Sequence, residues 1–138
     1  MGEVEHDHSG MIRTHPQATN VDRDTLGRCI AECFRCAATC TSCADACLGE
    51  ETVHKLVRCI RLNLDCADLC ATTGQMLSRQ TAFEPQLARH IVEACAQACR
   101  ICGDECEQHA EHHEHCRVCA DACRRCEAAC SQVVSTIG

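Results

Sequence analysis

Cysteine spacing between Cys29 and Cys47 is the feature that most constrains how this chain can fold. Six cysteines occur there, at successive gaps of 4, 3, 4, 3 and 4 residues. Residues three and four positions apart share one face of an α-helix. A helix in a bundle normally places leucine or isoleucine along that stripe. The spacing therefore predicts a helix whose inner face is lined with thiols.

The same spacing recurs in three later segments, so we expect four helices over about residues 24–48, 50–78, 85–113 and 116–137. Of the fourteen gaps within the four cysteine runs, thirteen are 3 or 4 residues, and the remaining gap of 7 has Asn63 at the missing step. The expected stripes are Cys29, Cys33, Cys36, Cys40, Cys43 and Cys47; Cys59, Asn63, Cys66, Cys70 and Leu77; Ala88, Ile91, Cys95, Cys99, Cys102, Cys106, His109 and His113; and Cys116, Cys119, Cys123, Cys126, Cys130, Val133 and Ile137.

Residues at the expected helix ends agree with this division. Asp22 or Asp24 can cap the first helix, and Gly49 suits the position just past its end. Glu50 and the glutamate after it would then lie at the positive start of the second helix. Pro85 fits the first position of the third helix.

Short turns between four amphipathic helices predict an all-α fold, an antiparallel up-down-up-down four-helix bundle with a cysteine-lined core, over residues 24–138. Residues 1–23 form a polar extension that carries His6, His8, Met11 and His15, and Pro16 prevents a long helix there. Its histidines and methionine could capture metal, but we expect this extension to be a solvated, partly ordered tail.

Charge and hydropathy exclude several kinds of partner. The formal net charge is −7, and the chain has no tryptophan, no tyrosine and no basic run, which argues against nucleic acid. No apolar stretch approaches the length of a membrane span. The N-terminus lacks the apolar segment of a signal peptide, so we expect a cytoplasmic location.

Eighteen cysteines in 138 residues require a chemical explanation. Two cysteines one turn apart on a helix are poorly placed for a disulfide, although bridges between helices remain possible. Inert packing does not account for them, because leucine or isoleucine would bury more apolar area. Metal binding remains, and thiolates select Cu(I), zinc or iron–sulfur clusters.

Cu(I) fits a continuous column of thiols better than the other metals do. Each Cu⁺ replaces one thiol proton, so filling the core leaves the net charge unchanged. A zinc ion held by four thiolates would leave two buried negative charges. Iron–sulfur clusters usually draw cysteines from irregular loops rather than from continuous helices. Eight pairs with the spacing C-x₃-C, of which Cys29 and Cys33 are the first, could each clamp one soft ion.

These arguments favour a cytosolic store that binds many Cu(I) ions and catalyses no reaction. A metallochaperone or sensor remains an alternative, which a low metal stoichiometry would favour. A zinc or iron–sulfur protein is a second alternative, and a visible colour would favour an iron–sulfur protein. The candidate metal ligands are the eighteen cysteines named above, together with Asn63, His109 and His113.

Histidines collect at one expected end of the bundle, where we expect metal to be taken up. His109 and His113 continue the stripe of the third helix beyond Cys106, which favours them as ligands. For His112 and His115 the sequence does not distinguish a metal ligand from a simple polar residue at the helix end. His54 lies off the stripe of its helix, so we expect it at the surface. Asn63 is either a ligand through its amide oxygen or a buried amide bonded to backbone. The opposite end gathers an apolar plug of Leu77, Leu87, Ile91, Val133 and Ile137.

The C-x₃-C pairs within four helices, with His109 and His113 beyond them, resemble the cytosolic copper storage proteins over residues 24–138. The resemblance implies a four-helix bundle filled with cysteine-bound Cu(I), no catalysis and a homotetramer. Because we expect no export signal, the chain resembles the cytosolic branch of that family rather than the exported one. Asn63 departs from a complete column of thiols.

Overall fold

The structure is a computed structural model, and the residues that it describes are 7–17 and 21–137. Its α-helices are α1 (Asp7–Arg13), α2 (Arg23–Leu48), α3 (Val57–Leu77), α4 (Pro85–His109) and α5 (Glu114–Thr136), with a short 3₁₀ helix η1 (Val53–Lys55) before α3. None of these helices is both long enough and apolar enough to cross a membrane.

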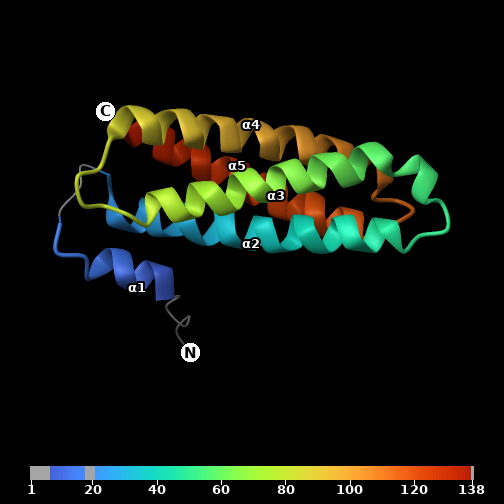
Figure 1. Ribbon diagram of the computed structural model, residues 1–138, viewed down its shortest axis with the longest axis horizontal. Helices are drawn as coiled ribbons and strands as arrows, with labels where there is room; N and C mark the ends of the chain where they lie inside the picture. Colours follow the sequence, from blue (N-terminus) through green and yellow to red (C-terminus); the bar gives the residue numbers. More distant parts are fainter. Residues whose placement is uncertain (1–6, 18–20, 138) are drawn as a thin grey trace.

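Helices α2 to α5 form an up-down-up-down bundle in which each helix packs against two neighbours (Figure 1). The α2–α3 and α4–α5 turns lie at one end of the bundle, which we call the mouth. The α3–α4 turn and the start of α2 lie at the other end, which we call the base. The predicted fold class and three of the four predicted helix starts are therefore confirmed to within a few residues.

The observed helix ends follow from local chemistry. The Asp22 carboxylate caps α2 by accepting a hydrogen bond from the Thr25 backbone N–H at 2.9 Å. Pro85 occupies the first turn of α4 as predicted, after Glu84, whose side chain accepts a hydrogen bond from Gln86 N–H. Gly49 ends α2 with a φ of −84°, so the left-handed conformation typical of a terminal glycine is not used there.

The predicted start of the second helix is wrong. Residues 50–56 form a turn and η1, and α3 begins only at Val57. Leu56, 1% exposed, is buried at the N-cap of α3 and anchors this connection. Glu50 therefore does not sit at a helix N-terminus, and its carboxylate instead binds two histidines at the mouth.

Part of the N-terminal extension, expected to be a solvated and partly ordered tail, is folded and packs on the bundle. Helix α1 packs along the outside of α2, near the base (Figure 1). Ile12 is 3% exposed and belongs to the same core cluster as the bundle. The His8 ring lies 6.1 Å from the Phe34 ring. His15 and Met11 also lie in this segment, whereas His6 falls outside the described residues.

Two nearly buried glutamates form ion pairs between neighbouring helices of the bundle. Glu32 on α2 pairs with Arg125 on α5 at 3.3 Å, and Glu105 on α4 pairs with Arg58 on α3 at 3.2 Å. The first ion pair joins α2 to α5, which are not consecutive in the chain. The second joins α3 to α4, which follow one another along the chain. Both ion pairs complement the apolar and thiol packing inside.

The apolar base differs in detail from its prediction. Leu77, Val133 and Ile137 are buried there as expected, but Leu87 is 56% exposed and Ile91 is only half-buried. Val92, fully buried, takes the core position on α4 instead, because the stripe passes through residues 88, 92, 95 and 99. Leu26 and Ile30 complete the base from α2.

Candidate metal centre

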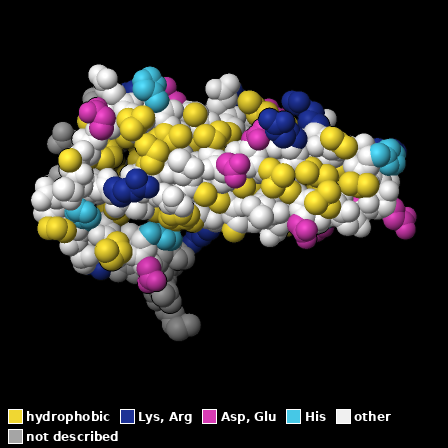
Figure 2. Space-filling view, in the orientation of Figure 1, with side chains coloured by type: hydrophobic (Ala, Val, Ile, Leu, Met, Phe, Trp, Pro, Cys, Tyr) yellow, Lys and Arg dark blue, Asp and Glu magenta, His cyan; other side chains and the backbone are white. Residues whose placement is uncertain are grey.

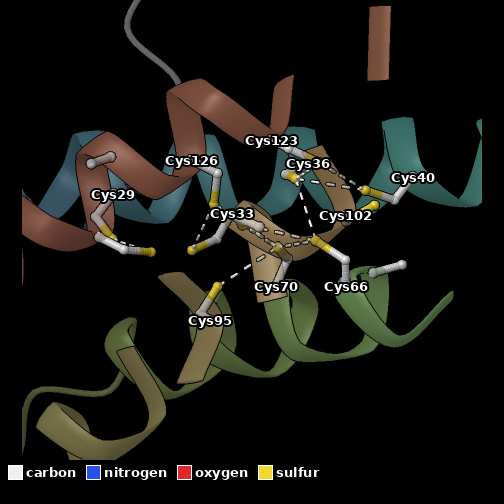
Figure 3. Close-up of a cluster of buried hydrophobic side chains, with 14 of the residues drawn as sticks. Cys29, Cys33, Cys36, Cys40, Cys66, Cys70, Cys95, Cys102, Cys123 and Cys126 are labelled. Carbon is white, nitrogen blue, oxygen red and sulfur yellow. Dashed lines mark hydrogen bonds between the residues drawn. The ribbon is translucent and has the colours of Figure 1, made fainter. Parts of the chain in front are cut away.

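The interior of the bundle is a continuous column of sulfur. All eighteen cysteines are buried and free, and none is joined in a disulfide. Figure 3 shows labelled thiols from different helices converging on the bundle axis. The helical spacing explains this directly, because steps of three and four residues keep every cysteine on the inner face of its helix.

Contacts between the thiols run mainly across helices. Cys36 on α2 has its sulfur 3.9 Å from that of Cys123 on α5 and 4.0 Å from that of Cys66 on α3. Contacts one turn apart on the same helix also occur, as between Cys66 and Cys70 at 3.8 Å. The C-x₃-C pairs thus do not form separate clamps, because each sulfur also faces sulfurs of other helices.

Sets of four thiols lie close enough together to hold one metal ion, with all ligand atoms within 4.8 Å of one another. They include Cys33/Cys95/Cys126/Cys130, Cys36/Cys40/Cys66/Cys123, Cys36/Cys70/Cys99/Cys126, Cys40/Cys102/Cys119/Cys123 and Cys43/Cys47/Cys59/Cys116. Several thiols belong to two sets. The sets therefore overlap along the axis, and a thiolate shared by two sets could bridge two ions.

Asn63 occupies a step of the column and is fully buried. Its amide oxygen accepts hydrogen bonds from the thiols of Cys102 at 3.0 Å and Cys119 at 3.2 Å. Its amide nitrogen donates to the sulfur of Cys59 at 3.7 Å. The alternative in which this amide binds backbone is not what the structure shows, since its hydrogen-bond partners are thiols.

The thiols nearest the mouth contact a histidine. His115 Nδ1 lies 3.4 Å from the sulfur of Cys43 and 3.6 Å from that of Cys116, and its Nε2 lies 3.0 Å from a Glu50 oxygen. Burial acts to lower the pKa of His115, but hydrogen bonds with Cys43 and Glu50 outweigh it and raise that pKa. Burial also raises the pKa of Cys47 to about 11, so this thiol keeps its proton at neutral pH until a metal displaces it.

His109 and His113 lie at the mouth, but not on one continuous helix as expected. Helix α4 ends at His109, and His113 is the N-cap of α5. His109 Nε2 is 2.9 Å from Glu105, and His113 Nδ1 is 2.6 Å from Glu50. Both imidazoles are thus held by carboxylates, while His115 makes the direct contacts with sulfur.

A hollow of about 310 Å³ opens beside these groups at the mouth. It is lined by Thr52, Lys55, Leu56, His109, His112 and His113. His54 is exposed, as predicted from its position off the stripe. Histidine is also visible at the right-hand end of Figure 2, which is the mouth. The hollow lies beside the histidines of the mouth, whereas aliphatic side chains fill the base.

Sequence reasoning gave too little weight to His115 and misplaced Glu50. His115 immediately precedes Cys116, so the stripe rule places it beside the column rather than on it. Its contact with Cys43 depends on how the end of α2 meets the start of α5. The only available signal was its proximity to the first cysteine of the last run.

The residues from 22 to 135 match the family model Csp, described as copper storage protein. The chain belongs to the copper storage protein family. This membership, with the observed helical bundle and buried thiols, confirms the family and the copper-storage class predicted from the sequence.

Solved structures of copper storage proteins are similar to this chain over most of its length. The copper storage protein Ccsp from Streptomyces lividans, loaded with 10 copper equivalents, is 51% identical, with a TM-score of 0.91 over 94% of this chain and 98% of that chain. A structure of copper loading to a cytosolic copper storage protein from the same organism, with five coppers, is 53% identical, with a TM-score of 0.82 over 83% and 96%. Cu(I)-bound copper storage protein BsCsp3 is 38% identical, with a TM-score of 0.68 over 77% and 94%.

Proposed function

We propose that this member of the copper storage family holds many Cu(I) ions in the cytosol, for storage and detoxification, and that it catalyses no reaction. The observation that carries the proposal is the column of eighteen buried, unbridged thiols arranged in overlapping sets of four. A single transfer site would not need so many sulfurs. The cytosolic location is supported by the S. lividans relative described as cytosolic.

Charge favours Cu(I) as the stored ion. Each Cu⁺ that enters displaces one thiol proton, so the buried column gains no net charge as it fills. Four thiolates around a divalent zinc ion would instead keep two negative charges, and the core offers no cation to balance them, since Lys and Arg lie outside the column. If two thiolates bind each ion and each thiolate bridges two ions, eighteen thiolates hold about eighteen ions.

The proposed ligands are the eighteen cysteines, with Asn63, His109 and His113 as candidates at the incomplete step and the mouth. His115 joins this set because its Nδ1 lies 3.4 Å from the Cys43 sulfur. The glutamates bound to these histidines would orient the rings and fix which nitrogen is free.

An anaerobic titration of the reduced protein with Cu(I), against a competing chelator, tests the storage function. We expect saturation near about eighteen ions per chain. Saturation at one or two ions would favour a metallochaperone or sensor instead. A preference for about one zinc ion per four thiols would favour a zinc protein.

We also propose that four copies assemble into a homotetramer, which rests on the family resemblance. A second observation supports a particular contact surface. Hydrophobic side chains gather over α3 and α4 (Figure 2), where Leu62, Leu69, Ala94, Ala98 and Ile101 line a groove of about 300 Å³. Apolar patches of this kind on a soluble protein commonly mark contacts with another protein. We assign this groove to a second copy of the chain.

A further inference from the structure

A buried hydroxyl lies at the base end of the thiol column. Thr73 follows Cys66 and Cys70 on α3 at steps of four and three residues, so it takes the next position on the same inner face. Its side chain is fully buried. Its hydroxyl oxygen has no hydrogen-bond partner among the residues that the structure describes. A buried hydroxyl without a partner destabilises a folded protein, so its position beside the column needs an explanation.

The packing of α3 against α4 shows which residue lies level with Thr73 on one side. The sulfur of Cys70 on α3 is 3.7 Å from that of Cys95 on α4. Because the two helices run in opposite directions, three residues forward on α3 correspond to three residues back on α4 (Figure 1). Thr73 is therefore level with Val92, which is fully buried and has no polar group in its side chain.

The same counting across α2 places the hydroxyl level with a pair of thiols. The Cys36 sulfur on α2 lies 4.0 Å from the Cys66 sulfur on α3. Seven residues forward from Cys66 is Thr73, and seven residues back from Cys36 is Cys29. The Cys29 sulfur lies 3.8 Å from that of Cys130 on α5. These two are the first and last cysteines of the chain, so their pair forms the base end of the column.

Loading with Cu(I) changes what the Cys29–Cys130 pair can accept. In the metal-free protein the Cys29 thiol donates to the Cys130 sulfur, and a neutral thiol is only a weak acceptor. Each Cu⁺ that binds displaces one thiol proton, and the resulting thiolate accepts a stronger hydrogen bond because it is charged. A threonine hydroxyl can rotate to donate such a bond. Direct coordination by the hydroxyl is disfavoured, since soft Cu(I) prefers sulfur to oxygen.

We propose that Thr73 is a positioning residue for the innermost Cu(I) ions, whose hydroxyl donates a hydrogen bond to the thiolates of the Cys29–Cys130 pair in the loaded protein. The hydroxyl has no partner before loading and gains one as the base end fills. The metal-free fold therefore carries a cost that copper binding removes, which strengthens the binding of the innermost ions. This inference rests on the proposed storage function and names a residue that favours filling of the closed end.

The stability of the metal-free protein gives the first test. Thr73→Val removes the hydroxyl and keeps the shape of the side chain. We expect the equilibrium constant for unfolding to fall roughly fivefold or more, because no unpartnered polar group remains buried. Urea denaturation followed by circular dichroism measures it. Thr72→Val, at the exposed threonine one residue earlier, is the matched control and should stay within roughly twofold of wild type. A destabilised Thr73→Val protein would show that the hydroxyl already has a partner, and would overturn the proposal.

Retention of copper gives the second test, which a role in packing alone would not affect. Loaded proteins are equilibrated anaerobically with increasing concentrations of a Cu(I)-specific colorimetric chelator, and the copper transferred is measured. We expect Thr73→Val to release about two ions, one for each thiolate of the pair, at roughly tenfold lower chelator concentration. That factor is the one expected for a lost hydrogen bond to a charged group. Thr73→Ser keeps the hydroxyl and should retain copper as wild type does, as should Thr72→Val.

The outcomes separate this proposal from the storage function. Release curves of Thr73→Val and wild type that coincide, with both proteins binding about eighteen ions, would overturn the role of Thr73 and leave storage intact. A wild-type capacity of only a few ions would instead overturn storage itself. Weaker retention in Thr73→Ser that equals the weaker retention in Thr73→Val would also overturn the role of the hydroxyl.

Discussion

At the scale of single residues, the mouth depends on a small hydrogen-bonded group rather than on the cysteine pattern. One Glu50 oxygen binds both His113 at 2.6 Å and His115 at 3.0 Å, and the two rings stack with their centroids 5.5 Å apart. The hydrogen bond with His115 lowers the pKa of Glu50, so its carboxylate is ionised at neutral pH. This carboxylate orients the imidazole that touches the outermost thiols.

We predict that His115→Ala and Glu50→Gln each slow the uptake of Cu(I) roughly tenfold, as expected when a metal-site residue or its orienting partner is lost. The final capacity should change by at most about one ion, because the thiols remain. Stopped-flow measurement of Cu(I) transfer to the metal-free protein checks both. Glu51→Gln, at the exposed neighbouring glutamate, is the control and should behave as wild type. Equal rates in all four proteins would show that the group does not assist uptake.

At the scale of elements, α1 is the helix that the sequence pattern did not predict. It is only seven residues long, too short to be stable alone, and it is held by packing on α2. Ser9 approaches Gly27 so closely that a Cβ on Gly27 would meet its hydroxyl at 3.2 Å. Ile12 supplies the buried contact. Tertiary packing rather than intrinsic propensity therefore orders this helix.

We predict that Ile12→Ala lowers the free energy of unfolding of the metal-free protein by about 2–4 kcal/mol, through lost apolar contact and an unfilled cavity. Met11→Ala, next to it on the same helix but 66% exposed, should change that free energy by less than about 0.5 kcal/mol. Urea denaturation followed by circular dichroism measures both values. Similar small effects in the two variants would mean that α1 does not contribute to the fold.

At the scale of the whole molecule, the bundle is a tube with unlike ends and one apolar outer groove. The mouth carries histidines and carboxylates, the base carries aliphatic side chains, and sulfur fills the space between them. The groove between α3 and α4 reaches as far inward as Cys66, which lies in its lining. A second copy bound there would cover the groove and add a layer of protein between the Cys66 thiol and solvent.

We predict that the purified chain has the mass of four copies, about 60 kDa from four times 15.1 kDa, in size-exclusion chromatography with light scattering. Leu69→Glu, in the groove, should reduce that mass because it buries a charge in the contact. Leu64→Glu, on the same helix but outside the groove and 44% exposed, should leave it unchanged. A wild-type mass near 15 kDa would refute the assembly, and equal masses in the two variants would exclude this groove as the contact.

The sequence by itself determined the four bundle helices and the inward position of every cysteine, because a step of three or four residues fixes the face of a helix whatever its neighbours are. It also determined the apolar base in outline and the soft-metal chemistry of the core. Only the tertiary structure decided which thiols meet across helices, that Asn63 joins two thiol sets, and that Glu50 holds His115 against Cys43. These contacts depend on the relative height and rotation of separate helices and on the course of the α2–α3 turn, and periodicity within one helix does not encode either.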